Sequence, residues 1–165
     1  IGYLPPKEVI EVRFLSRAQK MLHTTLKKFN HPETLVKEYD NWWLLCRLKQ
    51  VTLGSLVLIC KDEVEAFSKI SAESFSEFPK IIKELELKLK KEFGYDKINY
   101  MMLMMADPEV HFHIFPRYSI DRNFENTCFR DAGWPDLPDT KNPNNVGKDI
   151  FVALIHRLKS VFNNS

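Results

Sequence analysis

The chain has 165 residues, a length that a single domain with a substantial hydrophobic core usually accounts for. Hydrophobic residues make up 44% and charged residues 28%, which is ordinary for a soluble globular protein. The formal net charge of +2 argues against a dedicated binder of nucleic acid polymers, which usually carries a strong basic excess. It leaves phosphate chemistry on a small molecule open.

The cysteines and the apolar runs bear on the cellular setting. Cys46, Cys60 and Cys128 form no Cys-x-x-Cys pair and predict no disulfide framework, which favours a reducing cytoplasm. No apolar run approaches the roughly 20 residues of a membrane span, so no membrane partner is expected. The chain begins at Ile1 rather than Met, which leaves a short leader open, although no segment resembles a targeting sequence.

The first third of the chain predicts one helix and two strands. Apolar residues recur every three or four positions over residues 8–29, as in an amphipathic helix. Pro32 ends this helix, because proline lacks a backbone donor and disfavours helix in the residue before it. Residues 35–47 and 54–60 are the two strands, and their short connection suits an antiparallel return.

A long helix is expected over residues 71–93. Ser71 is a good N-cap, and Gly94 suits the position just past the last turn. Pro79 predicts a kink or a break inside this helix.

Two further strands, over residues 98–105 and 109–115, are expected to pair as a hairpin through a tight turn at residues 106–108. Residues 119–147 are rich in Asn, Asp and Pro, and a loop of this length is usually functional or disordered. Its aromatic residues indicate that it docks on the domain. Residues 147–162 predict a final amphipathic helix.

The predicted strand before Pro116 carries the side chains best suited to catalysis or ligand binding. Polar Glu109, His111 and His113 alternate with apolar residues, the period-two pattern of a half-buried strand. Neighbours on one face of such a strand lie about 6.5 Å apart. Pro116 ends the ladder, and Arg117 adds a permanent cation. Packing alone does not account for three such groups on one face, so we interpret them as a candidate site.

Three interpretations fit two histidines on one strand face. An imidazole can attack phosphorus to form a phosphoramidate that water later cleaves. His-x-His can instead supply two metal ligands, with Glu109 or a distant residue as the third. Finally, both rings can be structural and satisfied by ordinary hydrogen bonds, and the pair alone does not decide among these.

The flanking residues add a family resemblance. Residues 110–117, Val-His-Phe-His-Ile-Phe-Pro-Arg, resemble the signature strand of the histidine-triad (HIT) superfamily, His-φ-His-φ-His-φ-φ, which Pro-Arg commonly follows. Residues 52–58, Thr-Leu-Gly-Ser-Leu-Val-Leu, look like the family's glycine-containing strand. The order of helix and hairpin also matches, so the resemblance covers residues 35–118.

The resemblance implies an α+β fold in which helices pack on an antiparallel five-stranded sheet, usually in a homodimer. The whole chain, residues 1–165, would then form one HIT-like domain with its core at about 35–118. The N-terminal helix at 8–29 and the loop and C-terminal helix at 119–165 would be additions to that core.

The resemblance also assigns roles. Members of the family, among them diadenosine polyphosphate hydrolases, hydrolyse or transfer nucleotides at an α-phosphate, without a cofactor or metal. The middle histidine is the nucleophile and falls on His111, and the third, which contacts phosphate oxygen, falls on His113. Glu109 completes the predicted catalytic set. The predicted substrate-binding residues are Arg47, Gly54, Ser55 and Arg117.

Three departures from the family pattern stand out. Glu109 replaces the first histidine, and a carboxylate there could raise the pKa of a nearby imidazole but would repel phosphate. The turn at residues 106–108 is too short for the polar loop that often holds the leaving group. Arg47 falls where many members place an acidic or amide residue for the ribose, and arginine donates but cannot accept.

The leading hypothesis is a HIT-like nucleotide phosphohydrolase or nucleotidyl transferase, acting on nucleotides or dinucleoside polyphosphates. The alternative is a HIT-fold nucleotide-binding or interaction module of weak catalytic power, which the replacement at Glu109 would allow. A metal-dependent hydrolase ranks third.

Overall fold

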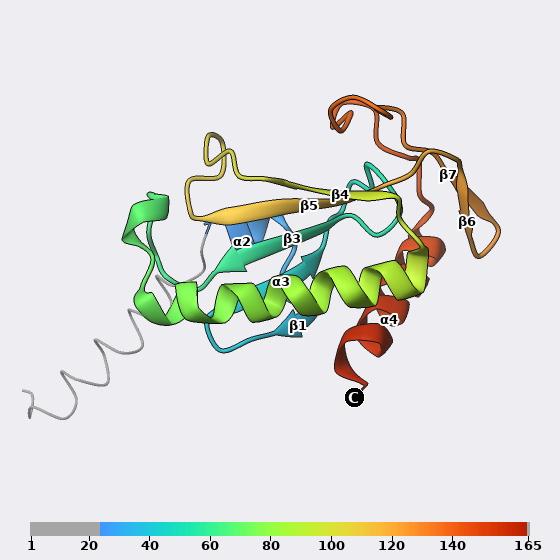
Figure 1. Cartoon of the computed structure of the whole chain (residues 1–165). Helices are drawn as coiled ribbons and strands as arrows, with labels where there is room; N and C mark the ends of the chain where they lie inside the picture. Colours follow the sequence, from blue (N-terminus) through green and yellow to red (C-terminus); the bar gives the residue numbers. More distant parts are fainter. Residues whose placement is uncertain (1–23, 165) are drawn as a thin grey trace, which may run out of the picture.

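The computed structural model describes residues 24–164, and these form an α+β fold. Five antiparallel strands make one sheet, as expected, and their order is β1-β2-β3-β5-β4. The long helix α3 and the C-terminal helix α4 cover one face of this sheet, and the short helix α2 covers the other (Figure 1).

The strands of the sheet differ from the predicted ranges. They are β1 (Leu35–Glu38), β2 (Trp42–Cys46), β3 (Leu56–Cys60), β4 (Lys97–Met101) and β5 (His111–Arg117). Most are shorter, whereas the last, β5, keeps its predicted length but begins two residues later and continues through Pro116, so the prediction that Pro116 ends it was wrong. The prediction of one strand over residues 35–47 was wrong, because Tyr39-Asp40-Asn41 turns the chain between β1 and β2. The turn is closed by the Tyr39 N–H, which donates to the Trp42 carbonyl at 2.8 Å. Asp and Asn are common turn formers.

The helices are α2 (Thr24–Lys28), α3 (Ala72–Phe93) and α4 (Lys148–Asn163), with a 3₁₀ turn at Phe67–Lys69. Ser71 caps α3 by accepting from the Ser74 N–H, and Gly94 adopts the predicted left-handed conformation. The helix continues through Pro79 rather than breaking there. The predicted helix at residues 8–29 lies largely outside the described residues.

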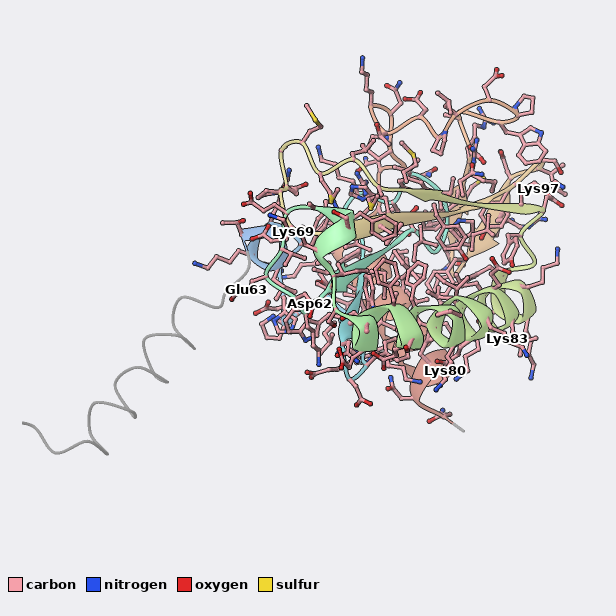
Figure 2. The ribbon with its side chains drawn as sticks, turned by 60° about the vertical axis from the view of Figure 1, so that its left-hand side comes forward. Asp62, Glu63, Lys69, Lys80, Lys83 and Lys97 are labelled. Carbon is pink, nitrogen blue, oxygen red and sulfur yellow. The ribbon has the colours of Figure 1, made fainter. Side chains whose placement is uncertain are left out.

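The outer side of α3 is charged. Lys80 and Lys83 are exposed there, on the side turned away from the sheet (Figure 2). The opposite side of the helix buries Ile81, Leu85 and Leu89. This division between polar and apolar sides explains why the helix could be predicted from spacing alone.

The sheet has a core on each face. The larger core joins α3 and α4 to Leu44, Leu58 and Ile114 and their neighbours. The smaller core lies under α2, where Leu26 and Phe29 pack on residues of β2 and β3. All five residues of β3 are buried, because this central strand is covered on both faces.

Two connections differ from the sequence predictions. The predicted tight turn at residues 106–108 is wrong in length, because β4 ends at Met101 and β5 begins only at His111. The predicted loop at 119–147 contains a hairpin of β6 (Arg122–Phe124) and β7 (Thr127–Phe129). Phe124 and Phe129 are buried in the larger core, so this segment does dock on the domain.

Candidate active site

The two histidines lie on β5, in the interior of the sheet between β3 and β4. His111 is opposite Ile59 and His113 is opposite Val57 of β3. Both rings are on the face that α2 covers, and their centroids are 4.9 Å apart. The prediction that they share one face is confirmed.

The ring of His111 is held in a defined orientation. Its Nδ1 lies 2.7 Å from the main-chain carbonyl oxygen of Glu109. A carbonyl oxygen can only accept, so Nδ1 carries the hydrogen and the neutral ring keeps its lone pair on Nε2. This Nε2 atom is buried and has no hydrogen-bond partner among residues 24–164. Such an arrangement suits a nucleophile, because the reactive nitrogen is not engaged elsewhere in the protein.

His113 is neutral at pH 7. Burial first, and then electrostatic interactions with His111, Arg47 and Lys28, lower its pKa to about 4, whereas Asp107 opposes the shift. Its buried Nδ1 also has no partner within the described part of the chain. A neutral ring can donate one hydrogen bond to a phosphate oxygen.

Aromatic side chains enclose the two imidazoles. The Phe29 ring lies 6.1 Å from the His111 ring and 5.7 Å from the His113 ring, centroid to centroid. Phe115 stacks on His113 from the next same-face position of β5, at 6.1 Å and an interplanar angle of 8°. As a result, His111 is only 1% exposed.

The carboxylate of Glu109 holds α2 in place over the histidines. It accepts hydrogen bonds from the Thr24 N–H at 3.1 Å, from the Thr24 hydroxyl at 2.9 Å, and from the Thr25 hydroxyl. Burial alone would raise the Glu109 pKa, but these hydrogen bonds outweigh it and lower the pKa to about 2. The sequence suggested that this carboxylate could act on a nearby imidazole, whereas the group of Glu109 that is hydrogen-bonded to His111 is the main-chain carbonyl. The strand begins only at His111, so alternation does not fix the direction of Glu109.

A cavity of about 290 Å³ opens beside His113. The residues that line it are Lys28, Phe29, Arg47, Leu48, Lys49, Asp107 and His113. Lys28 forms a 2.7 Å ion pair with Asp107, and the Arg47 guanidinium lies over the Phe115 ring at 5.6 Å. Three cations and one carboxylate therefore surround the cavity, and it has an excess of positive charge.

The comparisons with known proteins identify the family. The model of the HIT domain matches residues 28–120, more than half of the chain. The chain belongs to the HIT family. No match was found among curated proteins.

Solved HIT structures share this fold. A histidine triad protein from Marinobacter aquaeolei VT8 is 19% identical, with a TM-score of 0.67 over 86% of this chain and 95% of that one. A hypothetical histidine triad nucleotide-binding protein from Sulfolobus tokodaii is 18% identical, with a TM-score of 0.58 over 79% of this chain and 84% of that one. The Plasmodium falciparum diadenosine triphosphate hydrolase is 10% identical, with a TM-score of 0.58 over 81% and 79%.

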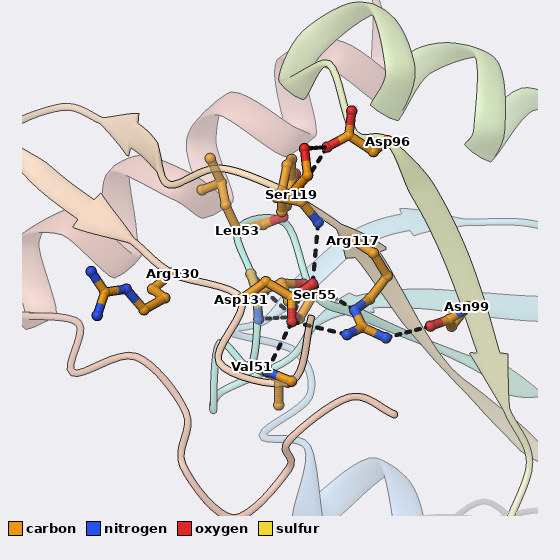
Figure 3. A network of polar contacts seen from close by, with 12 residues as sticks. Val51, Leu53, Ser55, Asp96, Asn99, Arg117, Ser119, Arg130 and Asp131 are labelled. Carbon is orange, nitrogen blue, oxygen red and sulfur yellow. Dashed lines mark hydrogen bonds and ion pairs between the residues drawn. The ribbon is translucent and has the colours of Figure 1, made fainter. Parts of the chain in front are cut away.

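Arg117 lies on the same sheet face as the histidines of this HIT domain, but its side chain contacts other residues, Asp131 and Asn99. It is 3% exposed, and its Nε donates to Asp131 at 2.6 Å and its Nη2 to the other oxygen of Asp131 at 3.0 Å. Its Nη1 donates to the Asn99 side chain at 2.7 Å (Figure 3). All three guanidinium nitrogens are thus engaged by protein groups.

Gly54 and Ser55 lie in the turn before β3, outside the lining of the cavity beside His113. Gly54 has a φ of +80°, and a side chain there would approach the Phe93 ring to 3.0 Å. The Ser55 hydroxyl donates to the Thr52 carbonyl at 2.7 Å. These contacts account for both residues through turn geometry, and their role in substrate binding stays a prediction.

The sequence interpretation missed Lys28, Phe29, Lys49 and Asp107 as neighbours of the histidines. Phe29 had a place only in the apolar stripe of a helix, and no spacing signal links it to a strand so distant in the chain. Within residues 24–164, no three His, Cys, Asp or Glu side chains come together to hold a metal ion. The same residues include no helix long and apolar enough to cross a membrane.

Proposed function

We propose that this HIT-family protein is a nucleotide hydrolase or nucleotidyl transferase that forms a nucleotidyl-histidine on His111. The observation that carries the proposal is the hydrogen bond between His111 Nδ1 and the Glu109 carbonyl, which leaves the Nε2 lone pair available. Nucleotides and dinucleoside polyphosphates are the proposed substrates. The nucleotide-binding and hydrolase descriptions of structural relatives are consistent with this proposal.

In the first step, His111 Nε2 attacks the α-phosphorus and forms an N–P bond. The P–O bond to the leaving group breaks, and the electron pair departs with that oxygen. In the second step, the oxygen of water or of an acceptor forms a new P–O bond while the N–P bond breaks. The proton of this nucleophile is released, and Nε2 regains its lone pair.

Nearby groups can stabilise the reacting phosphate. The neutral His113 ring has one N–H to donate to a phosphate oxygen, and Arg47 lies close enough to lower the His113 pKa through its charge. Charged and polar donors already in position favour the extra negative charge on a pentacoordinate phosphorus. This chemistry requires only side chains and water.

The reaction requires the aromatic cover over His111 to move. The Nε2 atom of His111 is buried and the Phe29 ring packs against the imidazole, so no phosphorus atom can reach Nε2 in this conformation. We therefore propose that α2 and Phe29 shift when substrate binds. Closing segments of this kind also exclude water from the reacting centre.

The remainder of a large substrate has space on the same sheet face. A second cavity, of about 1370 Å³, is lined by β4, Arg117 and residues 132–139. Met101, the residue opposite His113 in the β4–β5 pair, is one of its lining residues. Its size supports a dinucleoside polyphosphate rather than a mononucleotide alone.

Replacement of His111 tests the proposal. The His111→Asn variant should lose α-phosphate hydrolysis across a nucleotide panel by on the order of a thousandfold or more, because the nucleophile is gone. The matched control is His156→Asn, which alters an exposed histidine on α4 and should keep full activity. Unchanged turnover in His111→Asn would sink the proposal.

The buried Nε2 and the carboxylate at Glu109 favour one alternative, a nucleotide-binding module with weak catalysis. That alternative predicts binding of AMP without turnover of any phosphoester and without a covalent adduct. An adduct on His111 would rule it out.

We also propose that the protein is a cytoplasmic homodimer. The match to the HIT family, whose members are usually homodimers, supports the dimer. The thiols of Cys46 and Cys60 are free and buried, in keeping with a reducing compartment. Light scattering coupled to gel filtration tests the dimer, and a monomeric mass at micromolar concentration would contradict it.

A further inference from the structure

The cavity beside His113 is lined by more cations than a single reacting phosphate requires. Lys28, Arg47 and Lys49 come from α2, from the end of β2 and from the segment after it, and all three line the same space. Asp107 is the one carboxylate among the lining residues, and its charge is paired with Lys28. The cavity therefore keeps a net positive charge, which attracts an anion.

Arg47 is arranged to bind a ligand. Its Nη1 donates to the Lys49 carbonyl at 2.6 Å, which fixes the guanidinium, whereas its Nε is buried with no protein partner in residues 24–164. Burial lowers the Arg47 pKa, and the charge of Asp107 offsets this only in part. Burial of the charged guanidinium is therefore unfavourable in the absence of a ligand. A buried donor that stays unbonded is unfavourable, and an anionic ligand would remove the penalty.

The size of the cavity limits what it can hold. Its volume of about 290 Å³ is at the lower end for small-molecule pockets, which bury a whole drug-sized ligand. A phosphate group fits such a space more readily than a complete nucleoside. Arginine is also well suited to this task, because its planar fork matches the geometry of phosphate oxygens.

We propose that the cavity formed by Lys28, Arg47 and Lys49 binds a second phosphate group of the substrate, one that His111 does not attack. This inference rests on the proposed function only in taking the cavity as part of the substrate site. The ligand class is a nucleotide with at least two phosphate groups. The second phosphate comes either from the 5′ polyphosphate chain or from a phosphorylated sugar hydroxyl.

Calorimetric titration of the unmodified protein with three nucleotides separates these sources. AMP carries one phosphate, α,β-methylene-ADP adds a second in the chain without a cleavable bridge, and adenosine 3′,5′-bisphosphate adds it on the sugar. We expect one of the two doubly phosphorylated ligands to bind about tenfold to a hundredfold more tightly than AMP, as a charge-assisted hydrogen bond predicts. The tighter ligand identifies the source. Equal affinity for all three would overturn the proposal.

Variants locate the effect in the cavity. Arg47→Met and Lys49→Met should each remove most of the advantage over AMP, and Lys49 is exposed, so its loss does not threaten folding. The matched control is Lys27→Met, which removes an equal charge from an exposed lysine of α2 that does not line the cavity. An advantage retained in both Arg47→Met and Lys49→Met would also overturn the proposal.

His113 supplies a second readout. Its pKa is lowered in part by the charges of Arg47 and Lys28, so an anion bound between them should raise it. NMR titration of the His113 ring with and without the tighter ligand measures this shift, and an unchanged pKa would count against the site. These binding measurements are independent of chemistry at His111. If no adduct forms on His111 but the advantage stands, the catalytic proposal falls and this one holds.

Discussion

The two ends of β5 carry buried polar side chains on the same sheet face, but only those at one end have hydrogen-bond partners among residues 24–164 for all their nitrogens. At one end, Arg117 is fully engaged by Asp131 and Asn99. At the other end, His111 Nε2 and His113 Nδ1 are buried without partners in the described residues. The strand is equally regular at both ends, so the backbone does not explain the difference.

The comparison separates structure from function among buried polar groups. A buried charge whose nitrogens are all hydrogen-bonded holds elements together, here β4, β5 and the segment after β7 that contains Asp131. A buried nitrogen without a partner carries a free-energy cost that packing does not recover, so it indicates a reaction or a ligand. This criterion supports the proposal that the histidines act on the substrate, and the contacts of Arg117 within the fold account for its burial.

Breaking the Arg117 end should have the largest effect on stability. Asp131→Ala leaves the guanidinium buried and unpaired, which costs about 3–5 kcal/mol of unfolding free energy. Chemical denaturation measures the loss. The control, Asp121→Ala, removes an exposed carboxylate that pairs with Arg130 and should change stability far less. Equal losses in the two variants would show that burial of the Arg117 pair does not matter.

Removing the cover at the histidine end should destabilise the protein and expose the site. Phe29→Ala should lower the unfolding free energy by about 3 kcal/mol or more, because a buried ring is lost. Mass spectrometry measures the rate at which diethyl pyrocarbonate carbethoxylates His111. This rate should rise about tenfold for each 1.4 kcal/mol by which the substitution lowers the free energy of the local opening that exposes His111. Phe75→Ala alters an exposed ring of α3 and should leave the labelling rate unchanged. The same rate in all three proteins would contradict a covering role for Phe29.

The hold of Glu109 on α2 should show a pH dependence. The Glu109 pKa is about 2 in the fold against an ordinary value of 4.5, so its ionised form stabilises the native state above about pH 4.5. That contribution is lost as the pH falls toward 2. The difference in unfolding free energy between wild type and Glu109→Gln should therefore shrink over this range. A difference that stays constant from pH 6 to pH 2 would mean that the carboxylate does not hold the helix.

A second pH dependence concerns His113. Its folded pKa of about 4 lies below the ordinary 6.5, so the unfolded chain binds more protons between these values. Stability should therefore fall as the pH drops from about 6.5 to about 4, and His113→Asn should lack this part of the decline. An NMR titration with a midpoint near 6.5 in the folded protein would refute the burial argument.

Local sequence patterns predicted the secondary-structure elements but not the tertiary contacts between them. The fully apolar run of β3 and the capped, amphipathic α3 are encoded in neighbouring residues, so both could be predicted from sequence. The position of His111 and His113 on the same face of the sheet followed from strand alternation. Glu109 lies before the first residue of the strand, where alternation no longer holds, so the target of its side chain could not be predicted.

The parts of the site that come from distant segments had no signal in the sequence. Phe29 and Lys28 reach the histidines only because α2 packs across the sheet, which depends on tertiary contacts with Glu109 and Asp107. Arg117 was predicted to bind substrate from its place in the motif, which gave no sign of the ion pair with Asp131. Its partner Asp131 lies in a polar segment that carries no periodic pattern.

The most direct test of the account is a search for a nucleotide covalently bound to His111. Protein mixed with a dinucleoside polyphosphate, quenched during turnover at alkaline pH to preserve the N–P bond, is digested and analysed by mass spectrometry. We predict a nucleotidyl group on the peptide that contains His111, and its absence in His111→Asn. Full turnover of the substrate with no adduct on this peptide, together with unchanged turnover in His111→Asn, would contradict the account.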